Sequence, residues 1–191
     1  MVRSFLDDPV PRTDLDTLVG AFLRGPSAGN VRSAELLVLT DGDIGAYWDT
    51  TLAPERREGF AWPGLLRAPL LLLPYVHPQA YVDRYAEPDK AKTGLGEAVS
   101  AWTVPYWWVD GGAAVENVLL AATSMGLGAC FFGQFEHEPA VRERFSVPDD
   151  RRALGTIAIG RPAPDDRPSS SVSGPKRRRG RKAAHWGEWS S

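Results

Sequence analysis

The chain has 191 residues, of which 43% are apolar and 24% charged, a composition typical of a soluble globular protein with one domain. Its single cysteine, Cys130, excludes an internal disulfide framework and a multi-cysteine zinc site. No apolar run approaches the ~18 residues of a membrane span. The N-terminal stretch lacks the apolar segment of a signal peptide, so a cytoplasmic protein is expected.

Charge is distributed unevenly along the chain. Residues 161–191 hold eight basic and three acidic residues, a balance of +5, which leaves −7 for residues 1–160. A basic tail on an acidic body could contact nucleic acid or a membrane, or hold an anionic ligand. Composition alone leaves these three alternatives open.

Apolar periodicity predicts the elements of the first half of the chain. Leucine, valine and phenylalanine at helical spacing predict a helix over residues 13–23, with Thr13 as its N-cap. Residues 35–40 read as a short buried strand, followed by a weak helical pattern over residues 44–52. The continuous apolar run 69–76 predicts a strand that is covered on both faces.

The second half contains the strongest helical signal. Residues 106–125 keep an apolar side along their whole length and predict a long helix, whereas the more polar residues 78–103 predict one or two helices. A strand over 129–132, a helix over 138–145 and a last strand over 153–159 complete the expected order.

Sequence motifs for side-chain catalysis are missing. The chain has no Gly-x-Ser-x-Gly, no phosphate-binding Gly-x-x-x-x-Gly-Lys-Ser/Thr and no His-Glu-x-x-His. Its histidines, His77, His137 and His185, are too far apart in sequence to form a recognisable metal motif, so no metal is expected. Cys130 lies in an apolar strand, where a buried, inert thiol is expected. A bound cofactor is therefore the expected source of any reactivity.

Two glycine-containing segments could approach such a cofactor. Residues 25–30 form a small-residue turn in which Ser27 and Asn30 can donate or accept hydrogen bonds, although an ordinary helix-ending loop would look the same. In residues 126–135, backbone amides near Gly133 and Gln134 could face a ligand. The alternative there is simply a helix end followed by a strand.

The basic tail offers a third candidate site. Lys176, Arg177 and Arg178 could bind a phosphate, or could form a solvated basic surface. Trp186 and Trp189 follow closely, and two large apolar rings are expected to pack on something. That surface is either the body of the same chain or a partner subunit.

Taken in sequence order, short motifs resemble the FMN-dependent nitroreductase family. The motifs are Arg3-Ser4-Phe5, Pro26-Ser27-Ala28-Gly29-Asn30, the stretch from Asp110 to Gly133, Ile157-Ala158-Ile159-Gly160, and Arg177-Arg178 with His185-Trp186. The resemblance covers nearly the whole chain, at residues 3–40, 69–76, 110–162 and 176–189.

This resemblance implies an α+β fold of three α/β/α layers, in which helices flank a mixed, mainly antiparallel sheet. It also implies a homodimer with FMN at the subunit interface. Residues 1–162 would form the flavin-binding domain and 163–175 a linker. Residues 176–191 would form a C-terminal extension that is exchanged between subunits and packs on the partner.

The same resemblance assigns cofactor-binding residues. Arg3 would approach the FMN phosphate, and Arg177, with Lys176 or Arg178 beside it, would complete the anion site. The backbone at Gly133 and Gln134 would lie near the reactive edge of the flavin. The residues that would line the isoalloxazine ring are Pro26, Ser27, Ala28 and Asn30. Arg32 stands where the family usually has glutamine, so its contact with the ring would differ.

The activity implied is hydride transfer from NAD(P)H to FMN and then to an organic acceptor such as a nitroaromatic or a quinone, with no catalytic side chain. One alternative on this fold is an FMN-dependent dehydrogenase or oxidase of a small natural product, or a deazaflavin-linked reductase. A remote alternative is a basic-tailed binding protein without flavin. The aromatic segment 102–108 would cover a planar or hydrophobic substrate or would form part of the dimer core. No membrane or nucleic-acid partner is expected.

Overall fold

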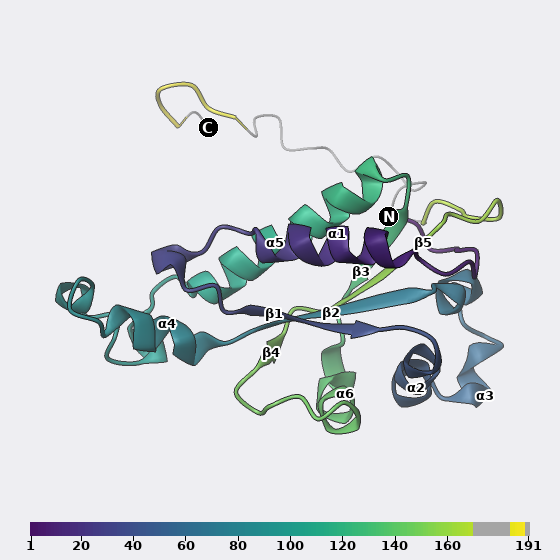
Figure 1. The fold of residues 1–191 in the computed structure, drawn as a ribbon, viewed down its shortest axis with the longest axis horizontal. Coiled ribbons are helices and arrows are strands. Elements are labelled where there is room, and N and C mark those ends of the chain that lie inside the picture. Colours follow the sequence, from purple (N-terminus) through teal and green to yellow (C-terminus); the bar gives the residue numbers. More distant parts are fainter. Residues whose placement is uncertain (170–183, 190–191) are drawn as a thin grey trace.

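The computed structural model describes residues 1–169 and 184–189. The helices and strands, all within residues 1–169, form three layers (Figure 1). A sheet with the strand order β1-β2-β5-β3 lies between α1 and α5 on one face and α2, α3 and α6 on the other. Every strand pairing within the described residues is antiparallel. The predicted three-layer α+β architecture is therefore confirmed.

The described elements follow the predicted order closely. The helices are α1 (Arg12–Leu23), α2 (Gly42–Thr51), α3 (Pro54–Arg57), α4 (Pro78–Tyr85), α5 (Tyr106–Ser124) and α6 (Glu138–Arg144). The strands are β1 (Ala34–Leu39), β2 (Leu70–Val76), β3 (Gly128–Phe132), β4 (Arg152–Ala153) and β5 (Thr156–Gly160). No helix in this part of the chain is long and apolar enough to span a bilayer.

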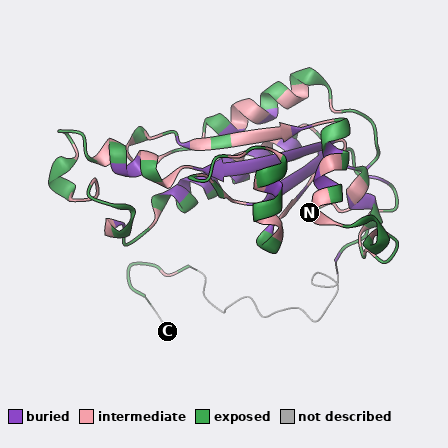
Figure 2. Ribbon diagram, turned by 90° about the horizontal axis from the view of Figure 1, so that it is seen from below, coloured by how far each residue is buried: buried purple, intermediate pink, exposed green. Residues whose placement is uncertain are grey.

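Strand β2 is the centre of the core. All seven of its residues are buried, as the continuous apolar run predicts (Figure 2). Leu71 and Leu73 belong to one apolar cluster, which includes residues of α2 and α6, whereas Leu70 and Leu72 belong to another, with α1 and α5. This division follows from the alternation of side chains along a strand.

The prediction of a single strand over residues 153–159 is wrong, because the chain forms two strands there, β4 and β5. On β2, Leu72 and Tyr75 are three positions apart, whereas their partners Ile157 and Ala153 are four positions apart. One extra residue on the β4–β5 side makes a bulge. Pro74 lies opposite this bulge and has no N–H to donate, which explains why a proline is tolerated in a central strand.

The prediction of Thr13 as the N-cap of α1 is also wrong. The helix begins at Arg12, and Pro11 occupies the N-cap position without a capping side chain. The carbonyl of Pro11 accepts hydrogen bonds from the N–H groups of Asp14 and Leu15, so Thr13 lies inside the first turn.

Of the two surfaces that the sequence leaves open for the C-terminal tryptophans, the body of the same chain does not bury them. Trp186 is 92% exposed and Trp189 is 87% exposed. The ring of His185 stacks on Trp189 with 4.2 Å between centroids. Packing on a partner subunit remains the alternative.

Candidate functional site

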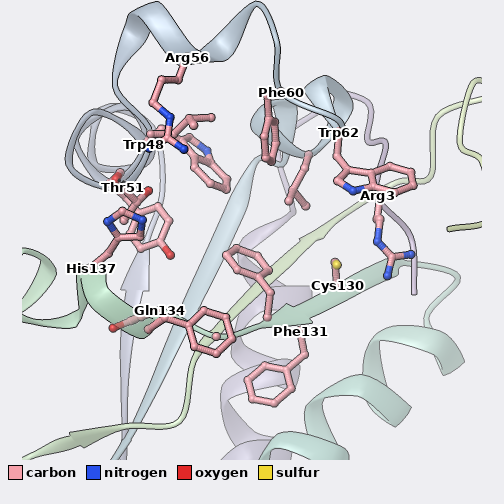
Figure 3. Close-up of a pocket in the computed structure, with 16 residues that line it drawn as sticks. Arg3, Trp48, Thr51, Arg56, Phe60, Trp62, Cys130, Phe131, Gln134 and His137 are labelled. Atoms are coloured by element: carbon pink, nitrogen blue, oxygen red, sulfur yellow. Dashed lines mark hydrogen bonds between the residues drawn. The ribbon is translucent and has the colours of Figure 1, made fainter. Parts of the chain in front are cut away.

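A pocket of about 440 Å³ opens beside the end of β3 (Figure 3). It lies between the sheet, the helices α2 and α3, and the segment that follows β3. Aromatic side chains supply much of its lining, and cationic groups lie at its edges. The lining includes Arg3, Tyr47, Trp48, Arg56, Trp62, Cys130, Phe132, Gly133, Gln134 and Phe135. Both the size and the apolar lining are typical of small-molecule sites.

Arg3 is held at the edge of this pocket by the N-terminal segment. Asp166 Oδ1 accepts hydrogen bonds from the backbone N–H groups of Arg3 and Ser4, at 2.8 and 3.0 Å. The Arg3 guanidinium lies over the ring of Trp62, 5.1 Å from its centroid, and forms no ion pair with any described residue. It is thus a fixed cation available to an anionic ligand. Asp166 belongs to the predicted linker, whose first residues are therefore bound to the domain.

The turn after β3 is fixed by a buried polar network. Gln134 Nε2 donates to Thr156 Oγ1 at 3.2 Å and to the carbonyl of Gly155 at 3.3 Å. Thr156 Oγ1 also lies 2.8 Å from the hydroxyl of Tyr47, which ties the turn to α2. The N–H of Gly133 donates to no other described residue, so it is available on the pocket wall.

The buried hydroxyl of Tyr47 makes the stability of the fold sensitive to alkaline pH. Burial raises the pKa of Tyr47 to about 12, because desolvation disfavours the phenolate. Because the pKa of Tyr47 is higher in the folded state than in the unfolded state, its contribution to stability is fully present below pH 10, the ordinary tyrosine value. This contribution is lost as the pH rises from 10 to 12. Between pH 8 and 11, we expect the free energy of unfolding of the wild-type protein to fall by about 1.4 kcal/mol more than that of Tyr47→Phe. Urea unfolding at the two pH values measures this difference. Equal losses in the two proteins would contradict this.

Cys130 lies on the floor of the pocket and is only 4% exposed. Burial raises the pKa of its thiol, so the thiolate is disfavoured at neutral pH. Although it faces the pocket, this protonated thiol is a poor nucleophile, as the sequence predicts.

The loop over residues 26–32 is held by its own hydrogen bonds and does not line the 440 Å³ pocket. Asn30 and Arg32 both have positive φ, and the Arg32 guanidinium donates to Asn30 Oδ1 at 2.9 Å. The Ser27 hydroxyl accepts a hydrogen bond from the backbone N–H of Arg32. The loop is thereby closed on itself, with Pro26 and Asn30 exposed to solvent.

Asp110 of α5 anchors this loop through a hydrogen bond to its backbone. The side chain is only 9% exposed, and its Oδ2 accepts hydrogen bonds from the Ala28 N–H and the Tyr81 hydroxyl, both at 2.7 Å. Arg84 of α4 adds a second anchor by donating to the carbonyl of Gly29. The position of Ala28 is therefore set by a buried carboxylate rather than by the loop sequence alone.

The structure separates the predicted site residues into two groups. Arg3, Gly133 and Gln134 line the 440 Å³ pocket. Pro26, Ser27 and Arg32 border a small cavity next to Asp110, and Ala28 faces an aromatic cavity with Trp102 and Tyr106. One subunit does not bring the two groups together. The predicted phosphate residues Lys176, Arg177 and Arg178 lie outside the described residues.

Several site residues were missed by the sequence analysis. Asp110 could have been suspected, since it is an acidic residue on the otherwise apolar side of a strong helix. Trp48, Arg56 and Phe135 carried no signal, because only the packing of α2, α3 and the turn after β3 places them around one pocket. No cluster of metal-ligating side chains occurs within residues 1–169 and 184–189.

Comparisons with known proteins agree with this architecture. The 4-nitrobenzoate reductase of a Nocardioides species is 29% identical, covering 83% of this chain and 75% of the relative. The FMN reductase (NADPH) of Bacillus subtilis is 35% identical, covering 85% and 62% respectively. The solved structure of an FMN-dependent nitroreductase from Clostridium difficile superposes with a TM-score of 0.64 at 20% identity, covering 98% of this chain and 94% of that one.

A likeness at 20% identity shows a shared fold and no more. The Nitroreductase family profile itself matches residues 1–161, which include both groups of site residues described above. The chain therefore belongs to the nitroreductase family.

Proposed function

We propose that this protein is an FMN-dependent oxidoreductase that takes hydride from NAD(P)H and passes it to an organic acceptor, such as a nitroaromatic or a quinone. The observation that carries the proposal is the 440 Å³ pocket, which combines an aromatic lining with a fixed, unpaired Arg3. The family membership and the names of the relatives support the same activity. A cytoplasmic location accords with NAD(P)H as the donor.

The pocket's residues fit FMN. Arg3 would bind the phosphate, and the free N–H of Gly133 would donate to the flavin edge, next to Gln134. The buried Nε1 of Trp48 also has no acceptor among the described residues, which leaves a donor beside an aromatic wall. When bound, FMN supplies the hydride chemistry, so the protein needs only to bind, orient and shield it.

The separation of the site residues favours a homodimer. A flavin held by Arg3 and Gly133 of one subunit would meet the loop over residues 26–32 only from the other subunit. Helix α5 exposes Trp108, Val109 and Leu120, an apolar surface available for such a contact. Residues 176–191 would extend onto the partner, burying Trp186 and Trp189 and adding Lys176, Arg177 and Arg178 to the phosphate site.

The proposed reaction balances with one hydride and one proton for each two-electron step. NAD(P)H and a proton reduce a quinone to the hydroquinone, or reduce a nitro group to a nitroso group with release of water. The protons can come from solvent, since the described pocket holds no buried carboxylate poised to give one.

The visible absorbance spectrum of the purified protein tests the cofactor directly. We expect flavin bands, release of FMN on denaturation, and anaerobic bleaching of the bands by NADH or NADPH. A colourless protein that also fails to take up added FMN would refute the proposal. Bound FMN that NADH and NADPH bleach only slowly would instead favour a substrate-oxidising or deazaflavin-linked relative.

A further inference from the structure

Phe135 combines an unusual backbone with an unusual environment. Its φ is +47°, in the left-handed region that bulky side chains rarely adopt. Its side chain is 80% exposed at the mouth of the pocket, whereas Phe5 and Phe22 are fully buried. Strained backbone of this kind is concentrated at functional sites, where another requirement outweighs its cost.

The Phe135 ring leans over the peptide of Gly133. A Cβ built at Gly133 would lie only 2.7 Å from the Cζ of Phe135, so glycine is required for the ring to lie there. Deeper in the pocket, the rings of Trp48 and Phe132 stack with 6.1 Å between centroids. The pocket therefore has an aromatic wall inside and a single exposed aromatic ring at its mouth.

We propose that Phe135 is a specificity-determining residue whose ring stacks on planar aromatic acceptors, an inference that rests on the proposed function. The proposed flavin edge lies at Gly133, so a planar acceptor waiting to be reduced there would lie next to the Phe135 ring. Offset stacking between aromatic rings gives such an acceptor additional affinity. Both the exposure and the strain of Phe135 are then explained by one bound ring.

The test compares two acceptors of different shape. Menadione is a planar quinone that can stack, whereas ferricyanide is an octahedral ion that cannot. We expect Phe135→Gly to raise KM for menadione about tenfold and to leave KM for ferricyanide unchanged. Phe135→Tyr should restore the wild-type KM for menadione, because it keeps the ring.

Further measurements separate stacking from a structural role. Phe135→Gly should keep the wild-type FMN content and the dimer mass. Its Tm should be unchanged or higher, because glycine adopts positive φ without strain. Val99→Ala shortens an apolar side chain that is 40% exposed and lines none of the pockets described above, so it serves as the matched control.

Three results would contradict the role proposed for Phe135 or the function on which it rests. An unchanged KM for menadione in a fully flavinated Phe135→Gly enzyme, or equal changes for the two acceptors, overturns the role of Phe135. Dissociation of the Phe135→Gly dimer would assign the ring to the subunit contact instead. A wild-type protein that binds no FMN overturns the proposed function, and this inference with it.

Discussion

Asp110→Ala is expected to lower the free energy of unfolding by about 2–4 kcal/mol, because it leaves one buried and one partly buried donor without an acceptor. These are the Ala28 N–H and the Tyr81 hydroxyl, each 2.7 Å from Asp110 Oδ2 in the wild-type protein. Since Ala28 belongs to the loop that would line the flavin, FMN affinity should fall as well. Urea unfolding and FMN titration measure the two effects.

Asp16→Ala is the matched control for this change. It also removes a carboxylate from a helix, but Asp16 is exposed and, among the described residues, its side chain pairs with Arg12 alone. Exposed pairs of this kind contribute about 0.3–0.5 kcal/mol, so its stability should be nearly that of wild type. Similar losses in Asp110→Ala and Asp16→Ala would show that the buried anchor is unimportant.

Arg3→Glu is expected to weaken FMN binding by at least about tenfold, because it replaces the cation proposed to meet the phosphate by an anion. The Arg3 side chain contacts Trp62 at the pocket edge, and its one hydrogen bond to a described residue is long, 3.5 Å to the Met1 carbonyl. Its replacement should therefore change Tm little. Fluorescence titration with FMN measures the affinity.

Arg12→Glu makes the same charge change at an exposed position on α1, away from the pocket. If both variants lose FMN equally, the loss reflects net charge and not a phosphate site at Arg3. Retention of wild-type affinity in Arg3→Glu would place the phosphate elsewhere.

Co-expression of the two damaging variants tests whether subunits share each site. In a mixed dimer of Arg3→Glu and Asp110→Ala, one site would receive the intact Arg3 and the intact loop, while the other would carry both changes. We expect such dimers to recover flavin in one site. No recovery would indicate that each subunit builds its site alone.

Much of the fold followed from sequence pattern. The continuous apolar run at 69–76 can be stable only where both faces are covered, and β2 is buried along its whole length. The long apolar helix at 106–125 is similarly defined by its own periodicity and appears as α5. Local pattern was insufficient at residues 153–159, because the bulge arises from the register with β2, a strand about 80 positions earlier in the chain.

For the site, sequence order was enough to indicate the family and the segments involved, and the family is confirmed. Only the tertiary structure decided that Arg3 and Gly133 share a pocket while Ala28 does not, and that Asp110 anchors the loop. The physical reason is that periodicity records which side of an element is apolar, whereas a pocket depends on which distant elements meet. Trp48, Arg56 and Phe135 lie on separate elements, and only packing brings them around one cavity.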